Sequence, residues 1–145
     1  MAIKVGGTTV VDDSRNLTNV AAATLTGTLT TVKIAETLVA VGNSGTAATI
    51  DLATGTVFTV TLNGNATLTI TNTTGAAAFT VILTNDGTPG RTVAWAASGG
   101  SFNFPGGAAA LARTTTASGV DIWVFFSPNG GTTWYGNIAM KAMAA

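Results

Sequence analysis

The side chains that could carry out acid–base chemistry are few in this chain. Its six acidic residues are Asp12, Asp13, Glu36, Asp51, Asp86 and Asp121. Because histidine and cysteine are absent, a serine nucleophile would have only lysine or a carboxylate as its base, and no such motif occurs. Asp86 and Asp121 could act as the carboxyl pair of a glycoside hydrolase if they converged. We instead predict no enzyme, since Asp86-Gly87 is typical of a turn and Asp121 can cap a loop or pair with Arg91 or Arg113.

The remaining polar motifs predict neither a metal nor a cofactor. Asp12 and Asp13 could bind calcium together with neighbouring carbonyl groups, but two adjacent acids are few for the oxygen-rich cage that calcium prefers. The glycines match no phosphate-binding spacing ahead of a helix. The absence of cysteine excludes disulfides and thiolate metal sites.

Aromatic side chains gather in one predicted hairpin over residues 120–136. Trp123, Trp134 and Tyr135 lie on its two strands, and residues 127–131 (SPNGG) form its turn. These three side chains could stack on sugar rings, or they could fill a core or a subunit contact. They are therefore candidates for glycan or subunit contact.

The first strand of this hairpin is apolar on both faces. Alternation places Ile122, Val124 and Phe126 on one face and Trp123 and Phe125 on the other. A hairpin this apolar is not stable alone in water. It must be sandwiched between layers, or its outer face must meet another subunit.

Charged residues make up only 8% of the chain, against about 25% in ordinary soluble domains. Six basic and six acidic residues cancel, so no net field attracts nucleic acid or an anionic membrane. No apolar run approaches the roughly 18 residues that span a bilayer, which predicts no membrane insertion. With 46% hydrophobic residues, a free monomer should be sticky, so we expect copies of the chain or other partners to cover it.

From residue 46 onward the chain alternates apolar and polar residues between turns rich in Gly, Asn and Pro, as in Phe58, Val60 and Leu62 with threonines between them. About eight or nine strands, one of them over residues 111–116, have the spacing of a sandwich. We predict an all-β domain over residues 46–145, an antiparallel β-sandwich of the jelly-roll kind. A β-solenoid would need a repeat of fixed length, and none is found.

Residues 1–45 differ and predict an extended N-terminal arm. Residues 3–5 and 8–11 form a hairpin closed by Gly6-Gly7, and the Thr-Leu-Thr repeat over 24–30 predicts two short strand pieces at a bend. The arm is too poor in large side chains for a core of its own, so its apolar residues should dock on a partner. The docking residues are Ile3, Val5, Val10, Val11, Leu17 and Val20. The start lacks the apolar region of a secretory signal, which predicts assembly in a cytoplasm.

Several stretches resemble a module of tailed-bacteriophage virion proteins that is common at tail-fibre ends. They include residues 86–95 (DGTPGRTVAW), 130–136 (GGTTWYG) and the opening 6–20. The resemblance covers most of the chain and implies a homotrimer in the virion, assembled in the host cytoplasm with other virion proteins and with no catalytic residues. The two ends are joined almost directly, unlike in long fibres, which implies a capsid decoration (cement) protein or a short tail fibre. The alternative is a tail-fibre tip that binds a host-surface glycan.

Overall fold

The computed structural model describes residues 3–5, 7–11, 33–107 and 111–143. The chain divides into two units, Met1–Ile34 and Ala35–Ala145. In the first unit, β1 (Ile3–Val5) pairs antiparallel with β2 (Thr8–Val11), which confirms the predicted hairpin. The described residues contain strands, turns and no helix, so the all-β prediction is confirmed.

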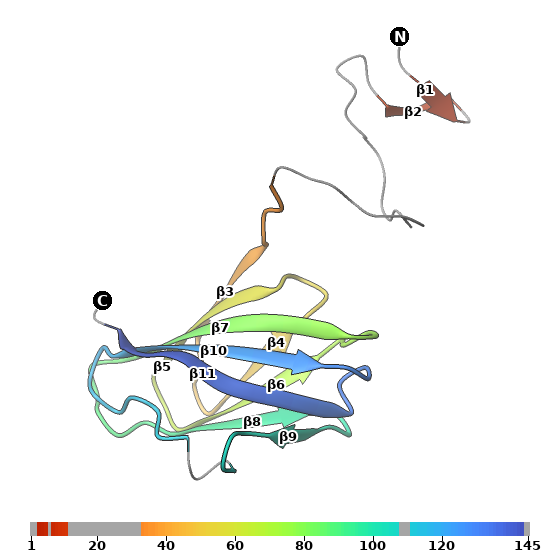
Figure 1. Ribbon diagram of the computed structural model, residues 1–145. Helices are drawn as coiled ribbons and strands as arrows, with labels where there is room; N and C mark the ends of the chain where they lie inside the picture. Colours follow the sequence, from red (N-terminus) through yellow and green to blue (C-terminus); the bar gives the residue numbers. More distant parts are fainter. Residues whose placement is uncertain (1–2, 6, 12–32, 108–110, 144–145) are drawn as a thin grey trace. The chain divides into compact units, whose positions relative to one another are not determined.

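The second unit consists of two sheets (Figure 1). Its described strands are β3 (Leu38–Asn43), β4 (Ala47–Asp51), β5 (Val57–Leu62), β6 (Ala66–Thr71), β7 (Ala77–Asn85), β8 (Val93–Ala97), β9 (Ser101–Asn103), β10 (Val120–Ser127) and β11 (Thr133–Met143). One sheet has the order β3-β5-β7-β10-β11-β9, and the other has the order β4-β6-β8. Together they make a sandwich-like fold.

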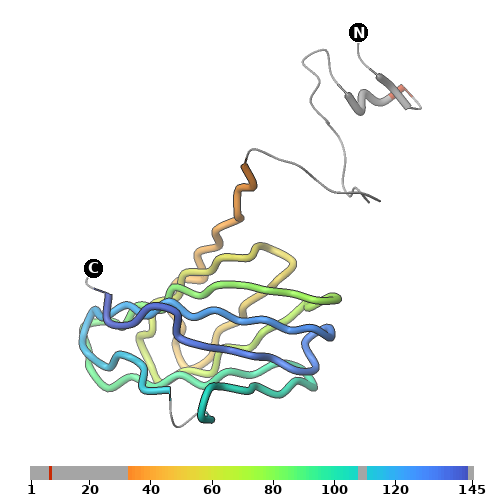
Figure 2. Tube along the Cα trace, in the orientation of Figure 1, coloured from red at the N-terminus to blue at the C-terminus, as the bar shows by residue number. Residues whose placement is uncertain are grey.

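The chain winds between the two sheets, because consecutive strands from β3 to β8 alternate between them (Figure 2). Each turn of this winding adds one strand to each sheet, so β3, β5 and β7 pair in parallel, as do β4, β6 and β8. Antiparallel pairs join β10 to β7 and β10 to β11, and β9 is parallel to β11. The predicted antiparallel jelly-roll arrangement is therefore wrong for most strand pairs.

Turns of unequal length hide the winding from a search for repeats. Leu38 lies opposite Val57, and Val57 lies opposite Thr80, so the second turn is longer than the first. In the other sheet Ala66 lies opposite Val93 across a turn that is longer still. Alternation of apolar and polar residues is the same in parallel and antiparallel strands, so it could not decide between them.

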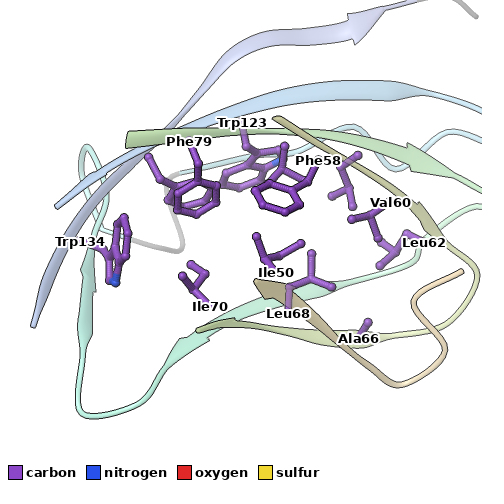
Figure 3. Close-up of a cluster of buried hydrophobic side chains, with 13 residues drawn as sticks. Ile50, Phe58, Val60, Leu62, Ala66, Leu68, Ile70, Phe79, Trp123 and Trp134 are labelled. Atoms are coloured by element: carbon purple, nitrogen blue, oxygen red, sulfur yellow. The ribbon is translucent and has the colours of Figure 1, made fainter. Parts of the chain in front are cut away.

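The core lies between the sheets, whose side chains point toward one another (Figure 3). Phe79 stacks on Phe125 with ring centroids 4.9 Å apart and meets Trp134 edge-on at 5.3 Å. The buried apolar residues are Ile50, Phe58, Val60, Leu62, Ala66, Leu68, Ile70, Phe79, Val81, Leu83, Trp123, Phe125 and Trp134. Each large member contributes about 1.5–3 kcal/mol relative to full exposure.

Two boundaries differ from those that the sequence predicted. β3 pairs with β5, so residues 38–43 belong to the second unit, whereas the prediction placed them in an arm ending at residue 45. Residues 111–116 form no strand. They run as an irregular segment in which the buried Thr114 donates its backbone N–H to Asp121 Oδ2 at 2.7 Å.

Candidate functional site

The outer face of the six-stranded sheet carries the candidate site. On this face Tyr135 of β11 lies opposite Phe126 of β10 on one side and opposite Asn103 of β9 on the other. In a neighbouring row, Asn137 lies opposite Val124. Directly opposed residues on one face of a sheet are close enough for their side chains to touch. Two aromatic rings are thereby flanked by two amide side chains.

These side chains border a groove of about 500 Å³. Its lining residues are Asn103, Phe104, Pro105, Val124, Phe125, Phe126, Tyr135, Gly136 and Asn137. Tyr135 is 53% exposed and Phe126 47% exposed, which is high for aromatic side chains in a folded domain. The groove offers apolar and aromatic contact together with amide hydrogen bonds, and none of its lining residues is charged.

The whole face is nearly free of charge. In the six strands of this sheet the only charged residues are Asp121, which is buried, and Lys141 near the end of β11. The large apolar residues exposed on these strands are Leu38, Val124, Phe126, Tyr135, Met140 and Met143. All but Leu38 lie on β10 and β11, and an exposed apolar cluster of this kind is typical of an interaction surface.

Gly136 allows the wall of the groove to pack closely. A Cβ at this position would lie 2.6 Å from the Phe125 ring and 2.7 Å from the Phe104 ring. The missing side chain therefore lets the Phe104 ring pack closely against Phe125 at Gly136. The sequence did not predict Phe104, Phe126, Asn103 or Asn137 as groove residues, because the groove forms where β9 joins β11, and no local pattern signals that pairing.

The predicted turn after β10 is confirmed, and it fixes the register of the hairpin. Gly131 donates its N–H to the buried Ser127 Oγ at 2.9 Å. Asn129 Oδ1 accepts the N–H of Thr133 at 2.9 Å, and Gly130 and Gly131 have φ values of 67° and 86°. This turn places Tyr135 opposite Phe126.

Two of the three aromatic candidates are not surface residues. Trp123 is 3% exposed and Trp134 is 0% exposed, so neither can stack on a sugar or meet a partner subunit. They point into the sandwich with Phe125, because this is the face of the hairpin that the three-stranded sheet covers. Tyr135 alone of the three lies on the outer face.

The acidic residues have structural partners rather than one another. Asp86 pairs with Arg91 at 2.9 Å and accepts the Thr88 N–H, and these interactions lower the pKa of the Asp86 carboxyl. Asp121 is buried and accepts the backbone N–H groups of Thr114 at 2.7 Å and Ala142 at 3.0 Å. The predicted roles of turn formation and loop capping are confirmed, while the carboxyl oxygens of Asp121 are both occupied by N–H donors.

Arg113 is anchored next to this network. Its guanidinium donates to the Arg91 carbonyl and to Asn85 Oδ1. Burial lowers the pKa of Arg113, and the nearby Asp121 charge partly opposes that shift. The two hydrogen bonds of Arg113 connect residues 111–116 to the sheets. Asn85 Nδ2 strengthens this connection by donating to the Thr114 and Thr116 carbonyls.

The docking residues predicted in the arm are only partly described. Ile3 and Val5 lie in β1, and Val10 and Val11 lie in β2. Leu17 and Val20 lie outside the described residues, as do Asp12 and Asp13. In the part of the chain that is described, no group of three or more His, Cys, Asp and Glu side chains could hold a metal ion. Within the same residues, no helix is long and apolar enough to cross a membrane.

The chemistry that this geometry supports is binding through apolar and aromatic contact, with amide groups at the margin. Comparisons with protein-family models, with curated proteins and with solved structures find no match to this chain.

Proposed function

We propose that the chain is a bacteriophage virion structural protein, a small homotrimeric surface protein that serves as a capsid decoration (cement) protein or a short tail fibre. One observation carries the self-association: the outer face of the six-stranded sheet is almost without charge and exposes a cluster of large apolar residues on β10 and β11. The virion assignment is supported by the resemblance of residues 6–20, 86–95 and 130–136 to phage fibre modules.

The exposed apolar residues of the outer face favour association between copies of the chain, but they supply only a limited free energy of association. Val124, Phe126 and Tyr135 are already about half-buried, so covering each adds about 1 kcal/mol, a fraction of the full transfer free energy. Association costs several kcal/mol in lost translational and rotational freedom. The face therefore needs a second contact, and the extended N-terminal arm, with Ile3, Val5, Val10, Val11, Leu17 and Val20, is the part of the chain that we propose for anchoring to the particle or to neighbouring copies.

The association is tested by placing a charge in the centre of the outer face. Phe126→Lys should convert trimers to monomers in size-exclusion chromatography with light scattering, because a buried unpaired ammonium is costly. Thr67→Lys is the matched control, since Thr67 is exposed on the outer face of the other sheet and should leave the trimer intact. If the unchanged chain is a monomer at high concentration, the proposal fails.

The location is tested on intact phage. The chain should be found by mass spectrometry in purified particles, and density for the two-sheet fold should lie on the capsid or the tail in a cryo-electron microscopy map. Particles lacking the chain should lose stability if it is a decoration protein and lose infectivity without loss of capsid stability if it is a fibre. Absence of the chain from particles contradicts the proposal.

A second function, glycan binding by a fibre tip, is favoured by the composition of the groove. Tyr135 and Phe126 present aromatic surface, and Asn103 and Asn137 present amide groups beside them. Glycan arrays should then show binding that Tyr135→Ala abolishes and Tyr135→Phe largely retains. Flat arrays together with a Phe126-dependent trimer favour the structural function.

A further inference from the structure

The three-stranded sheet has a free edge at β4. β4 pairs with β6 on one side only. The Thr46 carbonyl accepts the Thr67 N–H, and the Leu52 N–H bonds to Thr71 O, so the even-numbered residues point toward β6. Alternation then directs the backbone groups of Ala47 and Thr49 toward the open side, where no described residue bonds to them. Such unpaired groups are a template for another strand.

The edge of β4 is only weakly protected, because its one charged residue, Asp51, lies at the end of the strand. Native proteins protect edge strands with lysine, proline or a bulge. β3, the edge strand of the other sheet at the same end of the winding, has a register shift between Ala40 and Gly42, and Gly42 has a φ of 82°. β4 is in regular register along its whole length and has neither lysine nor proline.

Apolar side chains lie partly exposed at the same end. Val39 and Val41 of β3, and Ala48 and Leu52 at β4, pack against the core but are only partly buried. The opposite end of the six-stranded sheet continues into the β10–β11 hairpin and β9. The first turn therefore has no further strand beyond β3 and β4, as terminal repeats of wound folds do when uncapped.

The chain contains a near copy of the strand that already pairs with β4. β6 has the sequence Ala66-Thr67-Leu68-Thr69-Ile70-Thr71, and residues 23–28 read Ala-Thr-Leu-Thr-Gly-Thr, identical at five of six positions. Thr67 and Thr69 lie opposite Ala47 and Thr49 on the outer face, and Leu68 points into the core. A strand with the same alternation suits the other side of β4 in the same way.

We propose that residues 23–28 of a neighbouring copy, extended through Gly27 instead of bent there, add to the free edge of β4 as a fourth parallel strand, with Thr24 beside Ala47 and Thr26 beside Thr49. This inference rests on the proposed self-association and identifies its second contact. Each copy gives one segment and receives one, and such a head-to-tail contact can close into a ring of three. The added strand pairs the free groups of Ala47 and Thr49 and places Leu25 over the partly exposed Ala48.

Because the chain has no cysteine, a disulfide can report this contact in the full-length protein. The double variant Thr26→Cys/Thr49→Cys should form mostly disulfide-linked trimers under mild oxidation on a non-reducing gel, since adjacent strands lie about 4.8 Å apart, within the Cα separation of a disulfide, and a small local shift brings the two Cβ atoms into range. The matched control is Thr26→Cys/Thr59→Cys, whose second cysteine lies on β5 in the other sheet and should link several-fold fewer chains.

A monomer with an intrachain disulfide would overturn the proposal, because the segment would then fill the edge of its own chain. Trimers by light scattering with no disulfide would overturn it and leave the proposed function standing. An unchanged chain that is monomeric would instead contradict the proposed function.

Hydrogen exchange gives a second readout that does not depend on cysteine chemistry. The amide protons of Ala47 and Thr49 should be protected in the unchanged trimer. Leu25→Pro should abolish that protection, since in this register the Leu25 N–H faces β4 and proline removes it, while Leu25→Val retains it. Equal protection in the proline and valine variants would contradict strand addition.

Discussion

Asp121 links two segments near the C-terminal end through its carboxylate. Its buried carboxylate holds the irregular segment 111–116 through Thr114 and the end of β11 through Ala142. The sequence predicted that Asp121 caps a loop or pairs with Arg91 or Arg113. It could not identify the donors, since both are backbone N–H groups, which no side-chain pattern records.

Asp121→Asn should lower the free energy of unfolding by about 1–3 kcal/mol, because an amide offers one acceptor where two N–H donors need one each. Urea unfolding should show a lower midpoint at an unchanged m value. Asp51→Asn is the control: the carboxylate of Asp51 accepts from Ala53 and Asn72 near the surface, where water can replace the lost bonds. Equal losses in both variants would contradict a special role for Asp121.

The Asp86–Arg91 pair predicts a pH dependence with a definite sign. The side-chain hydrogen bond from Arg91 lowers the pKa of Asp86 below its ordinary 3.8, so the pair stabilises the folded chain above that pH. This contribution is lost as the pH falls through the lower folded-state pKa. Asp86→Asn should therefore show a smaller fall in Tm between about pH 5 and about pH 2.5 than the unchanged chain. An identical fall in Tm would show that the pair does not contribute.

At the scale of elements, strand positions could largely be predicted, but strand partners could not. Alternation located β5, β6, β7 and β10, and the Asn-Gly-Gly turn located the β10–β11 hairpin. The same alternation left open which face of β10 is inside, since both faces are apolar. The second sheet decides this by covering Trp123 and Phe125 and leaving Phe126 exposed.

Gly136→Ala tests the close packing of β11 against the groove wall. The added Cβ would lie under 3 Å from the Phe125 and Phe104 rings, and such overpacking should cost about 1–3 kcal/mol in urea unfolding. Gly87→Ala is the matched control, because a Cβ there meets nothing within 4 Å and the backbone needs no positive φ. A neutral Gly136→Ala would mean that Phe104 can move away from the sheet without loss.

At the scale of the whole molecule, the all-β class could be predicted from the sequence, whereas the winding of the chain between two sheets could not. Composition and turn spacing do not record which sheet a strand enters. The turn lengths differ, so no repeat marks the parallel pairs. The boundary was misplaced for the same reason, because the partners of β3 come later in the chain.

Two fragments test this boundary. Residues 35–145 contain every buried core residue that the structure describes and should keep the near-ultraviolet circular dichroism and cooperative unfolding of the full chain. Residues 46–145 lack β3 and the packing of Val39 and Val41, so their Tm should fall by several degrees, as losses of a few kcal/mol produce in domains of this size. Identical Tm values for the two fragments would show that β3 does not stabilise the second unit and belongs with the N-terminal arm.

A chain that alternates between two layers can change its length without changing its plan. One turn of the winding consists of one strand in each sheet and two connections. If such a turn is inserted or deleted, the later strands shift along the sheets but still pair with strands of the same kind. The longer connection before β8 shows that the joints tolerate extra residues. Relatives of different height, and variants carrying foreign peptides at these joints, are therefore accessible to this architecture.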